Sequence, residues 1–123
     1  MLEAYSTNVT VAADAAIPFN NVTIQKGRTA VLSGTQTIEL NKCGVYMVKV
    51  DGVASASTTV QMFKDGVAQP QAQSTGTTFG FATLVQVPRN NTSCCGSSPT
   101  LIQFSADAAV TMPNVNVVVT KVC

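Results

Sequence analysis

The sequence predicts an all-β fold, with antiparallel sheets arranged as a sandwich or barrel of about ten short strands. Valine and threonine, which favour extended backbone, are the two most abundant residues, at 18 and 16 of 123 positions. Turn-forming residues recur about every eight to twelve positions, and no long stretch has the periodicity of a helix. A chain of this length suits one domain, so we expect residues 1–123 to form a single unit.

The first third of the chain contains short candidate strands separated by polar turns. Pro18 has no N–H group to donate to a ladder, which predicts that the strand around it lies at a sheet edge. Met1–Thr10 is expected to be either an attachment segment or part of the first strand. The strands predicted here are Asn8–Val11, Ala16–Phe19, Val22–Gln25, Thr29–Leu32 and Thr37–Leu40.

The clearest strand is Cys43–Val50, which we expect to end at Asp51-Gly52. Lys49 is the charged residue of this apolar strand, and either pairs with Glu39 on a neighbouring strand or extends its stem to water. Successive side chains of a strand point to opposite faces. One face therefore carries Tyr46, Val48 and Val50, and the other carries Val45, Met47 and Lys49.

A hairpin is predicted around Asp65-Gly66, because this dipeptide suits a tight two-residue turn. Its strands are Thr58–Lys64 and Val67–Gln73, and the proline at position 70 marks the second as an edge strand. Ser74–Gly76 is expected to be a loop. The alternation places Phe63 on the opposite face from Val60 and Met62.

The C-terminal third indicates self-association. Thr78–Val87 and Asn114–Val122 carry apolar residues on both faces, whereas a strand in a two-sheet sandwich needs only its inner face to be apolar. Another copy of the chain would cover the second face; the alternative is a mildly apolar face exposed to water. Between these strands we expect a polar loop over residues 88–99, a strand Thr100–Ser105 and a turn over residues 107–109.

Composition argues against several classes of function. The absence of histidine excludes Ser-His-Asp and Cys-His catalysis and histidine-bound metals. A net charge of +1 argues against nucleic-acid binding, and no apolar stretch is long enough for a membrane helix. We therefore expect no enzyme, no cofactor and no metal. Three of the six carboxylates, Asp51, Asp65 and Asp107, lie in predicted turns, and we expect no catalytic pair among the six. The other three are Glu3, Asp14 and Glu39.

The cysteines leave three alternatives: disulfides, free thiols or a metal site. Adjacent cysteines fit zinc poorly, because structural zinc ligands are spaced more widely. A split pairing would join one of the adjacent cysteines to the C-terminal one and the other to Cys43, at about 2–4 kcal/mol of stabilisation per bridge. The four residues are Cys43, Cys94, Cys95 and Cys123.

The order of several short motifs resembles the jelly roll of the complement globular head and tumour-necrosis-factor superfamily. Gly44-Val45-Tyr46 has the form of the family's Gly-x-Tyr strand start, and residues 60–66, Val-Gln-Met-Phe-Lys-Asp-Gly, match the strand that follows it. Ile17–Phe19, Thr37–Leu40 and the valine-rich last strand fit the same scheme. The resemblance spans roughly residues 14–122 and is strongest to the Thr- and Val-rich jelly rolls of phage and bacterial surface proteins.

The resemblance implies a two-sheet, TNF-like jelly roll that forms a homotrimer about a three-fold axis. No acidic cluster suggests the calcium site of some relatives, and no collagen-like repeat precedes the domain. The residues that the resemblance implies as trimer or core contacts are Tyr46, Val48, Phe79, Phe81, Val117 and Val119.

These observations lead us to expect a non-enzymatic structural protein on a bacteriophage virion, as a head fibre, decoration protein or fibre knob. It would be made in the bacterial host cytoplasm. Its partners would be its own copies and other virion proteins. The loops Ser74–Thr78 and Arg89–Ser98 either recognise host-surface glycans through their amides and hydroxyls or are inert, solvated tips. The alternatives are the trimerisation head of a bacterial or spore surface protein, and a carbohydrate-binding module.

Overall fold

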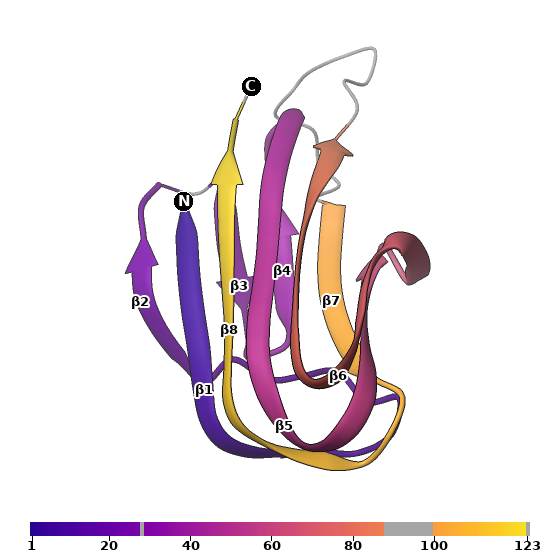
Figure 1. Cartoon of the computed structure of the whole chain (residues 1–123). Coiled ribbons are helices and arrows are strands. Elements are labelled where there is room, and N and C mark those ends of the chain that lie inside the picture. The colour runs from indigo at the N-terminus through magenta and orange to yellow at the C-terminus, as the bar shows by residue number, and fades with distance from the viewer. Residues whose placement is uncertain (28, 88–99, 123) are drawn as a thin grey trace.

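The computed structural model describes residues 1–27, 29–87 and 100–122, which form a two-layer antiparallel sandwich (Figure 1). The hydrogen-bonded order is β2-β1-β8-β5-β7-β4-β3, and β6 pairs with β5. The first layer contains β2, β1, β8 and one half of the β5–β6 hairpin; the second contains the other half with β7, β4 and β3. The strands are β1 Leu2–Val11, β2 Asn21–Gln25, β3 Ala30–Ser33, β4 Thr37–Leu40, β5 Gly44–Lys64, β6 Val67–Val87, β7 Thr100–Ala106 and β8 Val110–Lys121.

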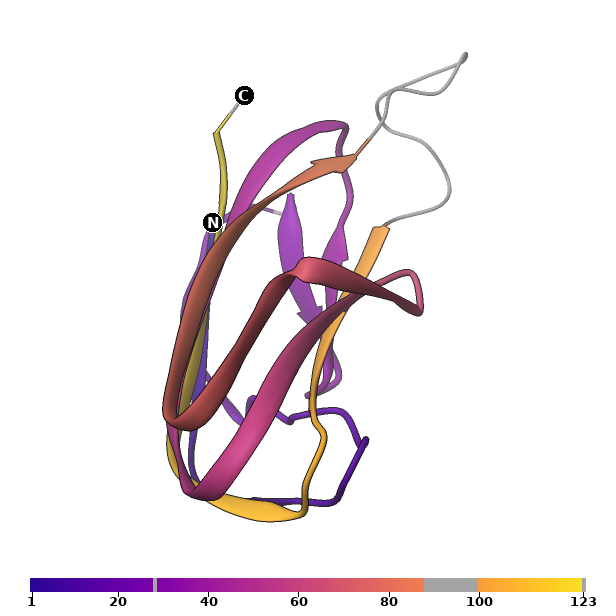
Figure 2. The same ribbon diagram turned by 45° about the vertical axis from the view of Figure 1, so that its right-hand side comes forward.

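Two long strands, β5 and β6, belong to both layers. Each has 21 residues, and they pair with one another along most of their length. Residues 46–53 of β5 also pair with β8, whereas residues 60–64 pair with β7. The ladder shifts its register between Val53 and Thr58, where the hairpin bends from one layer to the other (Figure 2). The fold turns this corner with a bulged, continuous strand and not with a loop.

The sequence-based prediction was wrong at this corner. Asp51-Gly52 does not end a strand and Ser74–Gly76 is not a loop, since both lie within β5 and β6. Gly52 is needed for space: a Cβ atom there would lie 2.5 Å from the Phe79 ring and 2.7 Å from the carbonyl oxygen of Asn114. Because the predicted pieces merge, the described residues form eight strands in place of about ten.

The tip of the long hairpin agrees with prediction. Asp65 and Gly66 both have positive φ, 51° and 82°, as a tight turn between strands of right-handed twist requires. Asp65 also holds the start of β7: its N–H donates to the carbonyl of Leu101 at 2.8 Å, and its Oδ1 accepts from the Leu101 N–H at 2.9 Å. The turn therefore fixes where β7 begins.

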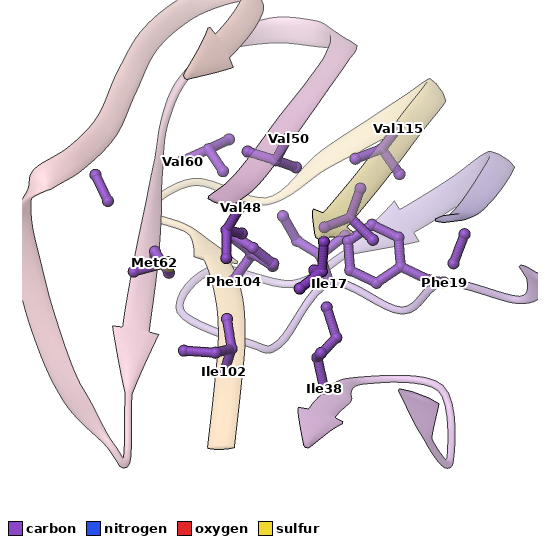
Figure 3. Close-up of a cluster of buried hydrophobic side chains, with 14 of the residues drawn as sticks. Ile17, Phe19, Ile38, Val48, Val50, Val60, Met62, Ile102, Phe104 and Val115 are labelled. Carbon is purple, nitrogen blue, oxygen red and sulfur yellow. The ribbon is translucent and has the colours of Figure 1, made fainter. Parts of the chain in front are cut away.

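The predicted edge strand Ala16–Phe19 is not a strand. Ala16 forms a single bridge to Ser105. The Ile17 N–H donates to the Phe104 carbonyl at 2.7 Å, and the Phe19 N–H donates to the Thr35 carbonyl at 2.7 Å. Pro18 interrupts any longer ladder. The segment crosses the open side of the sandwich and inserts the Ile17 and Phe19 side chains into the core (Figure 3).

The terminal strands are longer than predicted. Leu2–Val11 forms β1, so most of the segment Met1–Thr10 lies in the sheet, and β8 begins at Val110. The β1–β8 ladder runs from Leu2 opposite Val119 to Val11 opposite Val110. It omits Asn8, whose φ is 53°, opposite the proline at 113 that has no N–H to donate.

The core lies between the two layers and follows the period of two. Inward side chains of β5, β8 and β7 are buried. The ring of Phe19 meets that of Phe104 edge to face, with centroids 6.0 Å apart (Figure 3). Within the described part of the chain, every buried side-chain nitrogen and oxygen has a hydrogen-bond partner. The largest fully buried side chains are Tyr46, Phe19, Phe104, Leu2, Ile17, Ile38, Leu40, Met62, Ile102, Met112, Val48 and Val50.

Asp107 ties the predicted β7–β8 turn to the corner of β5. Its Oδ1 accepts hydrogen bonds from the Thr59 N–H and the Thr58 hydroxyl, each at 2.9 Å, and its own N–H donates to the Thr59 carbonyl at 3.1 Å. The bond from the Thr59 backbone and then the bond from the Thr58 hydroxyl favour the charged carboxylate and lower the pKa of Asp107.

Gly52→Ala is expected to destabilise the protein by about 1–3 kcal/mol, because the added methyl group meets a ring and a backbone carbonyl that have no room to move. Gly80→Ala is the matched control: its Cβ would meet the end of the flexible Asp51 side chain, which can rotate away. Urea unfolding of both variants measures the difference. Equal losses of stability would show that close packing at Gly52 does not shape the corner.

Asp107→Asn is expected to flatten the loss of stability in acid. Because the pKa of Asp107 is lower in the folded protein than its ordinary 3.8, the unfolded chain takes up the proton first. The carboxylate's contribution to folding stability is thus fully present above pH 3.8 and is lost as the pH falls through the folded-state pKa. The Asn amide oxygen can still accept hydrogen bonds but does not titrate. Urea midpoints measured from neutral to strongly acidic pH should fall less steeply in the variant; parallel curves would contradict this.

Candidate functional site

The described residues contain no group of three or more Cys, Asp or Glu side chains that could hold a metal ion. Over the same residues, no helix is long and apolar enough to cross a membrane. The feature that calls for a functional explanation is instead an exposed apolar surface.

This surface, here called the outer face, is the side of the first layer that points away from the core. Its centre is a cross-strand pair: Met47 on β5 lies opposite Leu84 on β6. Leu84 is 62% exposed and Met47 37% exposed. Lys49 lies opposite Ala82 on one side and Val118 on the other. Apolar side chains of three adjacent strands therefore share one exposed face.

Polar groups border the apolar centre of the outer face. Lys49 Nζ lies 3.6 Å from Asp51 Oδ2, and Asn116 on β8 is opposite Asp51 and also opposite Tyr5 on β1. The ion pair leaves this border without net charge. Of the two alternatives for Lys49, pairing with Glu39 is wrong, because Glu39 is on β4, whose neighbours β3 and β7 belong to the second layer. The Lys49 side chain is 53% exposed, in agreement with the alternative that it extends to water.

The structure turns the predicted contact residues toward the core. Phe79 is 3% exposed, and Phe81 is partly buried and packs against the core. The outer face is formed by the residues that alternate with them. The sequence carried this signal, since both faces of β6 and β8 are apolar, but nothing in it told which face points inward. The four fully buried members of the predicted set are Tyr46, Val48, Val117 and Val119.

Tyr46 shows why a Gly-x-Tyr sequence can open this strand. Its hydroxyl donates to the Lys42 carbonyl at 2.6 Å and accepts from the Lys42 N–H at 3.3 Å, which closes the turn between β4 and β5. Gly44 has a φ of 140°, outside the range that other residues favour. Burial raises the pKa of Tyr46, and its hydrogen bond with the Lys42 backbone opposes the shift.

Cys43 is disulfide-bonded. Cys94, Cys95 and Cys123 lie outside the described residues, as does the loop Arg89–Ser98, so the pairing scheme stays a prediction. The other candidate recognition loop, Ser74–Thr78, lies within β6.

Comparisons with known proteins identify the fold. No family model and no curated protein matches the sequence. The globular domain of zebrafish complement 1qA superposes with a TM-score of 0.75 at 7% identity, over 99% of this chain and 96% of that one. Rabbit GITRL superposes with a TM-score of 0.65 at 8% identity, over 100% of this chain and 95% of that one. The PRD1 vertex protein P5 superposes with a TM-score of 0.63 at 12% identity, over 99% of this chain and 96% of that one.

These similarities cover nearly the whole chain and agree on one architecture, although their sequence identity is low. They support the resemblance inferred from Gly44-Val45-Tyr46 and the strand leading to Asp65-Gly66. The chain has the all-β jelly-roll fold that the complement globular head shares with tumour-necrosis-factor-like proteins.

Proposed function

We propose that this chain is a non-enzymatic structural protein that assembles as a homotrimer and is displayed on a bacteriophage virion, as a head fibre, decoration protein or fibre knob. The observation that carries the proposal is the exposed pair Met47 and Leu84 at the centre of the outer face. Other virion proteins and host-surface glycans would be its further partners.

The energetics of this face support self-association. Burial of a fully exposed leucine or methionine side chain stabilises by about 1.5–3 kcal/mol. Leu84, at 62% exposed, would gain the larger part of this and Met47, at 37% exposed, the smaller, and a closed symmetric assembly repeats the gain at each interface. The ion pair between Lys49 and Asp51 borders the apolar centre without adding net charge. Each copy would bring the same apolar centre and neutral border to the assembly. The family resemblance implies that the assembly has three copies.

The similarity to the PRD1 vertex protein P5 supports the virion setting, because that protein carries the same fold and its name places it at a vertex. The runner-up is the trimerisation head of a bacterial or spore surface protein, which would use the same outer face. The two settings differ in where the chain is found.

Leu84→Asp is expected to weaken the trimer by at least about tenfold while leaving the fold intact, because a charge would replace an apolar contact at the interface. Val67→Asp is the matched control: Val67 is 63% exposed on the same strand but lies at the hairpin tip, far from the outer face. Native mass spectrometry should give three times the chain mass of 12.8 kDa for the wild type and the control. A wild-type monomer at micromolar concentration would overturn the homotrimer.

The virion setting has its own test. Particles purified by density gradient from the source culture should contain the chain at a fixed ratio to the major capsid protein, and antibodies to the chain should label intact particles in electron micrographs. Recovery of the chain only in cell-envelope or spore fractions would overturn the virion assignment and favour the bacterial surface.

A further inference from the structure

A pocket of about 230 Å³ opens on the second layer, away from the outer face. It lies between the segment after β1, the middle of β7 and the tip of the β5–β6 hairpin, elements that Figure 2 shows along one side of the molecule. The lining residues that matter here are Asp14, Ala16, Phe63, Gln103 and Ser105.

Phe63 supplies the apolar wall. It alternates with Met62, which is fully buried, so its ring points out of the sandwich, where it is half-buried beside Gln103 on β7. The ring contacts among the described residues involve Phe19, Phe81 and Phe104 but not Phe63. Phe63 is also not part of the core cluster. An aromatic ring in this position is available for a ligand.

Three hydrogen-bond acceptors line the same pocket. The Gln103 side chain donates from Nε2 to the Thr37 hydroxyl at 2.7 Å, which fixes the amide and leaves its Oε1 without a bond to the described residues. Over that same part of the chain, the Asp14 carboxylate and the Ser105 hydroxyl make no side-chain hydrogen bond. Polar groups gathered beside an aromatic wall suit a ligand with several donors.

The backbone holds these groups in place. The Asp14 N–H donates to the Ala106 carbonyl at 2.7 Å, and Ala16 forms a bridge with Ser105. Asp14 also has a φ of 61°, a left-handed conformation that aspartate tolerates better than most residues. The pocket is therefore built on ladder positions and a fixed turn. Because these backbone segments are already held in place, binding a ligand costs little further conformational entropy.

We infer that this pocket binds one pyranose ring of a glycan. The C–H face of the sugar would pack on Phe63, and its hydroxyls would donate to Asp14, Gln103 Oε1 and Ser105. Pockets for drug-sized ligands measure roughly 300–1,000 Å³, so this smaller one suits a single ring. A small cation would be drawn to Phe63 and Asp14, but Asp14 is exposed and water screens its charge. Three separate acceptors match a neutral polyol better.

The inference rests on the glycan partner of the proposed function, for which it names a site, but it does not depend on the homotrimer. The pocket lies on the second layer and the outer face on the first, so assembly through the outer face leaves the pocket open. If the chain binds sugars but is a monomer, the pocket inference stands and the homotrimer is overturned. If it is a trimer that binds no sugar, the homotrimer stands and the pocket inference is overturned.

The test is a titration of the ¹⁵N-labelled chain with the methyl glycosides of glucose, galactose and N-acetylglucosamine, followed by amide chemical shifts. At least one should move the amides of Phe63, Gln103 and Ser105, with a Kd on the order of 1 mM. Phe63→Ala should abolish the response and Phe63→Tyr should keep it. Asp14→Asn and Ser105→Ala should each weaken binding by roughly two- to tenfold, as expected for one lost hydrogen bond.

Val22→Ala, an exposed position on β2 in the first layer, is the control and should leave the response unchanged. Mannitol, which has hydroxyls but no ring, should not move these amides. The inference is overturned if none of the three glycosides moves them, or if the response survives Phe63→Ala. It is also overturned if choline moves them and the glycosides do not, since the pocket would then be a cation site.

Discussion

The fold depends on one constraint: a single hydrogen-bonded ladder, the β5–β6 hairpin, runs through both layers and has to bend without breaking. The bend is bulged between Val53 and Thr58, and Gly52 gives the Phe79 ring and the Asn114 carbonyl room to approach. Asp107 fastens the β7–β8 turn to the same bend through Thr58 and Thr59. Every other strand takes its position from this hairpin, since β8 pairs with one half of β5 and β7 pairs with the other.

This arrangement gives the two layers different surfaces. Because side chains alternate along a strand, burying Tyr46 and Val48 commits Met47 to the outside, and burying Met62 commits Phe63 to the outside. The first layer thereby presents an apolar face with Leu84 near its centre, suited to another copy of the chain. The second presents an aromatic ring among polar groups, suited to a small polar ligand. Assembly and recognition can thus use opposite sides of one small domain.

Local chemistry made part of this structure predictable. Asp65-Gly66 signals its turn through backbone preference, and the alternation in β5 separates Tyr46 from Met47 without any knowledge of the partner strands. The corner was not predictable in this way. Gly52 follows an aspartate and has the appearance of a turn residue, but its role depends on Phe79 and Asn114, which are distant in the sequence.

The candidate sites show the same division. The sequence indicated an uncovered apolar face and named a set of trimer or core contacts without deciding between the two. The structure turns this set toward the core, and the sequence could not decide because the direction of a side chain depends on which layer its strand belongs to. The pocket was missed because it joins Asp14, Phe63 and Ser105 from three separate segments.

The pairing of Leu2 with Val119 has a mechanical consequence. Both ends of the described chain leave from one end of two adjacent antiparallel strands (Figure 1). Tension that pulls these ends apart would open the β1–β8 ladder one rung at a time, which offers little resistance. Tension directed along β8 toward its C-terminus would instead load many rungs together, through β1 on one side and β5 on the other. The domain should therefore resist force far better when it is pulled along β8 through its C-terminal end than when the force acts between its two ends.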